Sequence, residues 1–102
     1  MQLSDNSKSL NNDEILAIIR LIFFIKFEAD DPELLIYAGS PTINSALEKM
    51  LLSHPFYKDR MEHFGQLNQE SLDFVKSKIL KDSRLNENML KELVNNCIFP
   101  YK

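Results

Sequence analysis

The sequence predicts an all-α protein, a single compact domain of about six helices around a central apolar helix at residues 13–28. Three observations lead to this prediction. Residues 15–27 read ILAIIRLIFFIKF, an almost continuous apolar run. Elsewhere, apolar residues recur at i, i+3, i+4 and i+7, which is the period of an α-helix. No segment alternates apolar and polar residues over the length that a strand needs.

The central helix has a clear predicted start. Asn11 suits the N-cap position and Glu14 the third helical position, and together they form a capping box. At about 1.5 Å per residue the apolar run spans roughly 20 Å, which is less than the ~30 Å core of a bilayer. A helix that is apolar on all sides is normally enclosed, so we predict that the rest of the chain surrounds this one. The alternative is a subunit of a larger complex, in which a partner covers the run.

Capping residues and helix breakers predict the other helices. Asp31-Pro32 and Ser40-Pro41 each place a capping side chain before a proline at the first helical position. Gly39 is suited to end the short helix between them. The predicted ranges are 32–38, 41–54, 55–64, 69–81 and 87–97.

Size and composition indicate one domain in a reducing compartment. The chain has 102 residues, enough for one hydrophobic core, and we assign residues 10–102 to a single helical domain. Residues 1–9 are polar and unpatterned, so we expect a flexible N-terminal tail. The single cysteine, Cys97, has no partner for an internal disulfide. The acidic residues Asp13 and Glu14 before the apolar run do not resemble a secretory signal, and we predict a soluble, cytoplasmic protein.

Charge is divided unevenly along the chain. Residues 1–48 hold eight acids and three bases, a net charge of −5, and residues 49–102 hold seven acids and nine bases, a net charge of +2. The acidic first half disfavours general binding to nucleic acid, which requires a basic surface.

No residue pattern predicts catalysis, a metal or a cofactor. Asp59 and His63 are spaced to share a helix face, but with His54 they match no known metal-ligand spacing. Cys97 falls on the apolar face of its predicted helix, where a core cysteine is expected rather than a nucleophile. We therefore predict a protein that is not an enzyme and that carries no metal or cofactor.

Two cations interrupt the apolar run. Arg20 and Lys26 are six positions apart, so they face different directions around the helix. We expect both to extend to the edge of the core or to pair there, with Arg20 the better candidate for an ion pair. The alternative is a functional polar site in which they meet buried carboxylates.

The sharpest local feature is an acidic segment, residues 28–33, which reads EADDPE. Helix capping accounts for Asp31 and Glu33 but not for Glu28 or Asp30. The functional interpretation is a docking patch for a basic partner, with Tyr37 nearby as an aromatic anchor. The alternative is an ordinary solvated loop.

A basic group near the C-terminal end of the 69–81 helix supports a second hypothesis. It consists of Lys76, Lys78, Lys81 and Arg84. A small regulatory or phage-type protein that binds nucleic acid or transcription machinery would use such a group. Interleaved acids and the acidic first half of the chain speak against it.

In size, helicity, mild acidity and lack of a catalytic motif, together with the acids at 28–33, the chain resembles the small immunity proteins of bacterial toxin–immunity pairs. These include the immunity proteins of contact-dependent inhibition systems. The resemblance implies a cytoplasmic protein that binds one cognate toxin, often a basic nuclease, and covers its active site. It also implies no membrane and no small-molecule substrate. No family motif locates the binding residues, so the acids themselves predict the surface: Glu28, Asp30, Asp31, Glu33, Tyr37, Asp13 and Glu14.

Overall fold

The computed structural model describes residues 9–81 and 86–102, and within them the protein is built from helices without strands. The elements are α2 (Asn12–Phe27), a 3-10 helix η1 (Pro32–Leu34), α3 (Leu35–Ala38), α4 (Pro41–Ser53), a 3-10 helix η2 (Met61–His63), α5 (Gln69–Leu80) and α6 (Glu87–Ile98). The all-α prediction is confirmed. All but Ser9 of the tail predicted at 1–9 lies outside the described residues.

The helix starts predicted at Asn11, Asp31 and Ser40 are confirmed. The Asn11 side chain accepts a hydrogen bond from the Glu14 amide at 2.8 Å, and the Glu14 carboxylate accepts one from the Asn11 amide at 2.8 Å. This closes the predicted capping box of α2. Asp31 caps η1 by accepting a hydrogen bond from the Glu33 amide, and Ser40 caps α4 by accepting one from the Ile43 amide. Each stands before a proline.

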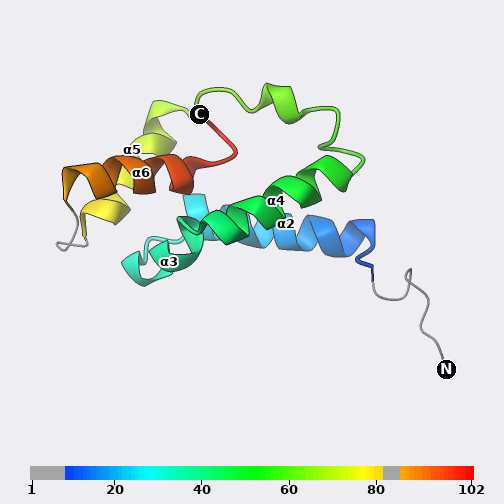
Figure 1. Cartoon of the computed structure of the whole chain (residues 1–102), viewed down its shortest axis with the longest axis horizontal. Helices are drawn as coiled ribbons and strands as arrows, with labels where there is room; N and C mark the ends of the chain where they lie inside the picture. The colour runs from blue at the N-terminus through cyan, green and yellow to red at the C-terminus, as the bar shows by residue number, and fades with distance from the viewer. Residues whose placement is uncertain (1–8, 82–85) are drawn as a thin grey trace.

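α2 is the central element, because α3, α4, α5 and α6 all pack against it. Figure 1 shows α4 lying along α2 and the α5–α6 pair at the other side of the molecule. The core has two parts. Ile15 and Ile19 of α2 meet Leu47 and Leu51 of α4 in the first. The second joins buried side chains of α3, α5 and α6: Leu35, Ala38, Val75, Ile79, Cys97 and Ile98.

The expectation that α2 is enclosed on all sides is wrong. Leu21 is 56% exposed and Phe24 is 49% exposed. Both lie on a face of α2 that none of the described elements covers. The helices that pack against α2, namely α3, α4, α5 and α6, contact its other faces.

The helix predicted at 55–64 is also wrong, which reduces the count of α-helices from about six to five in the described residues. The segment forms successive tight turns: Arg60 bonds back to Tyr57, and His63 to Arg60, each three residues apart. Aromatic packing holds this shape. Phe64 stacks on Tyr57 with ring centroids 6.2 Å apart and meets the Tyr101 ring edge-on at 5.3 Å.

Lys26 is completely buried, contrary to the expectation that it would reach the edge of the core. Its ammonium donates hydrogen bonds to the carbonyl of Ala38 at 2.7 Å, of Asn96 at 2.9 Å and of Cys97 at 3.4 Å. Ala38 ends α3, and the other two lie in the last turn of α6. The cation therefore satisfies carbonyls at the negative ends of two helices. Arg20, by contrast, is exposed, and within the described residues it does not form the ion pair for which it was the better candidate.

Lys78 of α5 is the counterpart of Lys26 and is also fully buried. Its ammonium donates to the carbonyls of Ile25 at 2.8 Å, Lys26 at 3.2 Å and Ala29 at 2.9 Å. These carbonyls belong to the C-terminal turn of α2 and the residues just after it. The two lysines thus connect the C-terminal ends of α2, α3 and α6.

Burial changes the pKa values of both lysines. The pKa of Lys26 is lowered from 10.5 to about 8, mainly by burial; Cys97 acts in the opposite direction, and the positive charge of Lys78 contributes to the lowering. Burial also lowers the pKa of Lys78. A pKa of about 8 leaves Lys26 protonated at pH 7, the state in which it has three protons to donate.

Gly39 provides a close approach between α3 and α6. A Cβ atom there would collide with Cδ1 of Leu93 and would lie 3.2 Å from the carbonyl oxygen of Leu35. Gly65 lies in the loop before α5, and a Cβ atom there would meet nothing within 4 Å.

Replacing Lys26 by methionine should destabilise the fold. The Lys26→Met side chain keeps the volume but leaves the carbonyls of Ala38 and Cys97 buried without a donor, at about 1–3 kcal/mol each. The Asn96 carbonyl keeps its hydrogen bond from the Asn44 side-chain amide. Removal of the buried charge offsets part of that cost, so we expect a net loss of about 2 kcal/mol or more in urea unfolding. Arg20→Met on the exposed side of the same helix is the control and should change stability by less than about 0.5 kcal/mol. Equal effects of the two substitutions would contradict a structural role for Lys26.

The pH dependence of stability should identify the Lys26 proton. Between pH 8 and pH 10.5 the unfolded chain holds a proton on Lys26 that the folded chain has lost, so raising the pH favours the folded state. From pH 7.5 to 9.5 we expect the unfolding free energy of the wild type to rise by about 2 kcal/mol relative to Lys26→Met. Burial raises the pKa of Cys97 in both proteins, which acts in the opposite direction, and Lys26 lowers that pKa. Loss of Lys26 therefore leaves the Cys97 pKa higher in the variant, which adds to the expected difference between the two proteins. A difference that stays flat over this range would show that Lys26 is not desolvated.

Gly39→Ala should lower stability by about 1–3 kcal/mol, because the new methyl group displaces the Leu93 side chain from the α3–α6 contact. Gly65→Ala is the matched control and should be neutral or slightly stabilising, since it only restricts the unfolded chain. Thermal unfolding followed by circular dichroism compares the two. Equal melting temperatures would mean that α3 and α6 are not in close contact.

Candidate functional site

An apolar groove runs between α2, α3 and α4. Its volume is about 310 Å³. Most of its lining is aliphatic, with one tyrosine. The lining residues are Ile18, Leu21, Ile22, Ile25, Tyr37, Ile43, Ala46 and Met50.

Some of the residues that line the groove are exposed. Leu21 of α2 and Tyr37 of α3 line it and are about half exposed, and the same helices carry the exposed residues Phe24 and Ile36, which do not line it. Scattered exposed apolar residues are normal, but a concave apolar surface with exposed lining residues is typical of a binding site.

Acidic residues of the 28–33 segment stand next to this groove. Glu28 is three residues beyond Ile25, and so continues the groove-lining face of α2. Glu33 precedes Tyr37 by one turn along η1 and α3. Both acids are exposed, and neither has an ion-pair partner among the described residues. These two carboxylates are therefore available to a partner.

The other two acids of the segment already have structural roles. Asp30 forms an ion pair with Lys81 at 2.7 Å, and both side chains are about half exposed. Asp31 caps η1 by accepting a hydrogen bond from the Glu33 amide at 3.0 Å. Exposed pairs contribute little to stability, but this one reduces the negative charge that the segment presents.

Asp13 and Glu14 lie at the opposite end of α2 from Glu28. Glu28 follows Glu14 by fourteen positions, which corresponds to about 21 Å along the helix axis. The predicted binding residues therefore do not form one cluster. They form two acidic ends, with the apolar groove and Tyr37 between them.

Of the residues that line the groove, only Tyr37 was predicted as a binding residue. The lining residues of α2 were missed because the apolar run was interpreted as core. A sequence signal for them does exist. Glu14, Ile18, Leu21, Ile25 and Glu28 are spaced 4, 3, 4 and 3 residues apart, so they form one stripe on a helix. Acids at both ends of an apolar stripe are unexpected in a helix that is buried on all sides.

The proposed basic cluster does not form. Lys78 is buried and Lys81 is paired with Asp30. Lys76 is exposed, and Arg84 lies outside the described residues. Of the three lysines in this group, only Lys76 is both exposed and unpaired.

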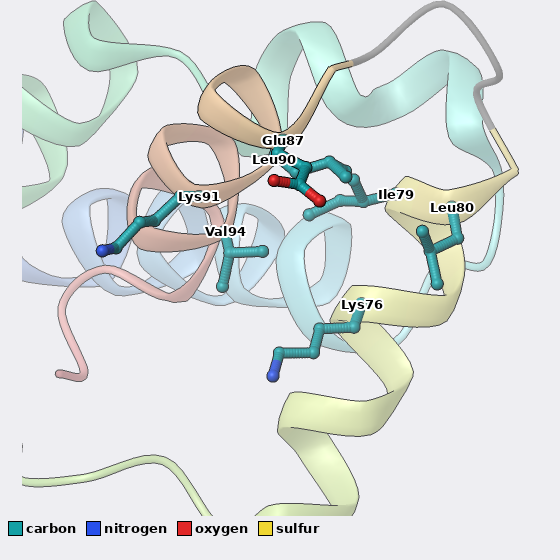
Figure 2. Close-up of a pocket in the computed structure, with 7 residues that line it drawn as sticks. All are labelled: Lys76, Ile79, Leu80, Glu87, Leu90, Lys91 and Val94. Carbon is teal, nitrogen blue, oxygen red and sulfur yellow. The ribbon is translucent and has the colours of Figure 1, made fainter.

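A second apolar groove lies between α5 and α6. Figure 2 shows Ile79, Leu90 and Val94 between the two helices, with the Lys76 and Lys91 side chains extending away from them. Its volume is about 360 Å³. Glu87 also lines it, so the charges at its edge are mixed and select no single kind of partner.

The residues considered for chemistry have structural surroundings. His54 is buried, and its Nδ1 accepts a hydrogen bond from the Phe56 amide at 3.1 Å, whereas His63 is exposed. Cys97 is buried, and burial raises the pKa of its thiol, which keeps it protonated and unreactive. Over residues 9–81 and 86–102, no three His, Cys, Asp or Glu side chains are grouped to hold a metal ion.

Comparisons with protein-family models, curated proteins and solved structures each found no match. In the part of the chain that the structure describes, no helix combines the length and the apolarity needed to cross a membrane.

Proposed function

We propose that this protein is an immunity-type inhibitor that binds one basic partner protein and blocks its active site. The observation that carries the proposal is the exposed apolar groove of α2, α3 and α4 with unpaired carboxylates beside it. The resemblance to small immunity proteins supplies the biological class, and a basic nuclease toxin is the partner that this class implies.

The surface has the composition of a protein-binding interface. Its centre is apolar and includes Tyr37, an aromatic residue of the kind that often anchors interfaces. Its edge carries Glu28 and Glu33, which would attract a cationic surface over several ångströms and speed association. An inhibitor needs no catalytic residue, because it acts by occupying the partner's substrate groove. The carboxylates would take the positions of the phosphates that a nuclease binds.

The nucleic-acid hypothesis has less support. Lys78 donates its protons to buried carbonyls, and Lys81 is paired with Asp30. Binding to a phosphate backbone depends on several accessible cations acting together. An acidic surface next to an apolar groove is the opposite of what a nucleic acid would select.

Reversal of two acids should remove partner binding. In the Glu28→Lys/Glu33→Lys variant, two repulsive contacts replace two attractive ones, and we expect affinity for the partner to fall at least about 30-fold. The measurement is capture of partners from the native host at low salt and at about 0.5 M salt, where screening shortens the range of charge interactions. Wild-type protein should retain one basic protein, and high salt should weaken that binding. It should also inhibit the nuclease activity of the captured protein.

The control is Glu62→Lys/Glu70→Lys, which changes net charge by the same amount on exposed residues outside the groove. This control should capture the partner as the wild type does. Equal capture by the Glu28→Lys/Glu33→Lys variant would contradict the proposed surface. Capture of nucleic acid or of transcription proteins in place of a basic protein would contradict the proposed function.

A further inference from the structure

We infer that the groove of α2, α3 and α4 binds a single amphipathic helix of the partner, with an apolar seam and a basic residue at each end. This inference rests on the proposed function and specifies the partner's contact segment. The evidence is the stripe on α2 that begins with Glu14 and continues through Ile18, Leu21 and Ile25, with Glu28 next in the same spacing as the C-cap residue just after the helix.

The spacing of the stripe favours a helix as the occupant. Steps of 4, 3, 4 and 3 residues keep its five side chains within about 40° of one direction around the helix. An apolar seam with this spacing packs against a partner helix by fitting side chains between side chains. The groove beside it, with Ile43 and Met50 of α4 on the far wall, supplies the second contact line of a helix-in-groove interface.

Charge identifies the ends of the occupant. Glu14 and Glu28 are exposed and stand about 21 Å apart at the two ends of the seam. Glu14 uses one oxygen to accept the Asn11 amide and keeps its negative charge. Glu33 adds a second carboxylate near the Glu28 end. A helix with lysine or arginine residues about four turns apart would meet an acid at both ends.

The same charges disfavour a second copy of this chain in the groove. Two α2 helices packed along this stripe in antiparallel order would place Glu14 of one against Glu28 of the other. In parallel order, each acid would face its own counterpart. Either arrangement sets like charges opposite each other beside an apolar contact, where repulsion is poorly screened.

Two designed peptides of about 18 residues test the inference. Both are acetylated, amidated helices with a leucine seam, and they differ only in carrying lysine or glutamate at the two end positions. Fluorescence anisotropy with the full chain measures their affinities. We expect the lysine-ended peptide to bind at least about tenfold more tightly than the glutamate-ended peptide.

Three variants locate the binding site. Leu21→Ser removes an exposed seam residue and should lower the affinity for the lysine-ended peptide at least about fivefold. Glu14→Lys/Glu28→Lys should reverse the preference between the two peptides. Leu80→Ser is the matched control, since Leu80 is an exposed leucine of the α5–α6 groove, 68% exposed, and it should bind as the wild type does. Circular dichroism establishes that each variant is folded.

Several results would overturn the inference. One is equal affinity for the two peptides. Another is loss of peptide binding in Leu80→Ser while Leu21→Ser binds as the wild type does. A third is that no lysine-ended peptide binds, whether its seam is made of leucine, isoleucine, methionine or phenylalanine. A dimer in analytical ultracentrifugation that Leu21→Ser dissociates would assign the groove to a second copy.

Capture of the native partner separates this inference from the proposed function. If Glu28→Lys/Glu33→Lys loses the partner while Leu21→Ser retains it fully, the inhibitor proposal stands and the helix-in-groove inference fails. If wild-type protein captures no basic protein, the proposed function fails whatever the peptides do.

Discussion

Two buried ammonium groups hold the centre of this molecule together. Lys26 and Lys78 lie at the junction of α2, α3, α5 and α6, and each donates hydrogen bonds only to backbone carbonyls. The C-terminal turn of a helix leaves carbonyls without donors, and these must find partners when they are buried. In this fold three helices end close together, so one cation on α2 and one on α5 donate to the terminal carbonyls that would otherwise need hydrogen bonds from water. Burying a charge is costly, but it is less costly here because the helix dipoles direct their negative ends at it.

This junction determines where the functional surface lies. The Lys26 ammonium ties the end of α3 to the end of α6, and Gly39 permits their close contact. The short α3 is thereby fixed beside α2, with Tyr37 facing the groove. α4 then runs back along the first half of α2, and the aromatic contacts of Tyr57 and Phe64 hold the irregular segment after it. Because these described elements pack against other faces of α2 or against one another, one face of α2 is left uncovered.

The uncovered face accounts for the proposed function without any catalytic residue. Apolar side chains at its centre supply contact area, and carboxylates at its two ends supply orientation and selectivity. The acids of the 28–33 segment divide their roles: Asp31 caps a helix, Asp30 pairs with Lys81, and Glu28 and Glu33 remain available. Of the lysines in and just after α5, Lys78 is buried and Lys81 is paired with Asp30, so only Lys76 is exposed and unpaired. This leaves the acidic surface as the feature most suited to a partner.

The sequence by itself determined the helical class and most helix boundaries. Caps at Asn11, Asp31 and Ser40 and the stop at Gly39 depend on residues close in sequence, and local hydrogen bonds decide them. It also located the acids beside the groove and Tyr37. Tertiary structure alone decided three other points. Lys26 is internal because helix ends distant in sequence converge on it. Residues 55–64 form turns because their aromatic rings pack on distant partners. One face of α2 stays open because none of the elements in residues 9–81 and 86–102 covers it. Each depends on contacts between residues far apart in the chain, which a local pattern of residues does not encode.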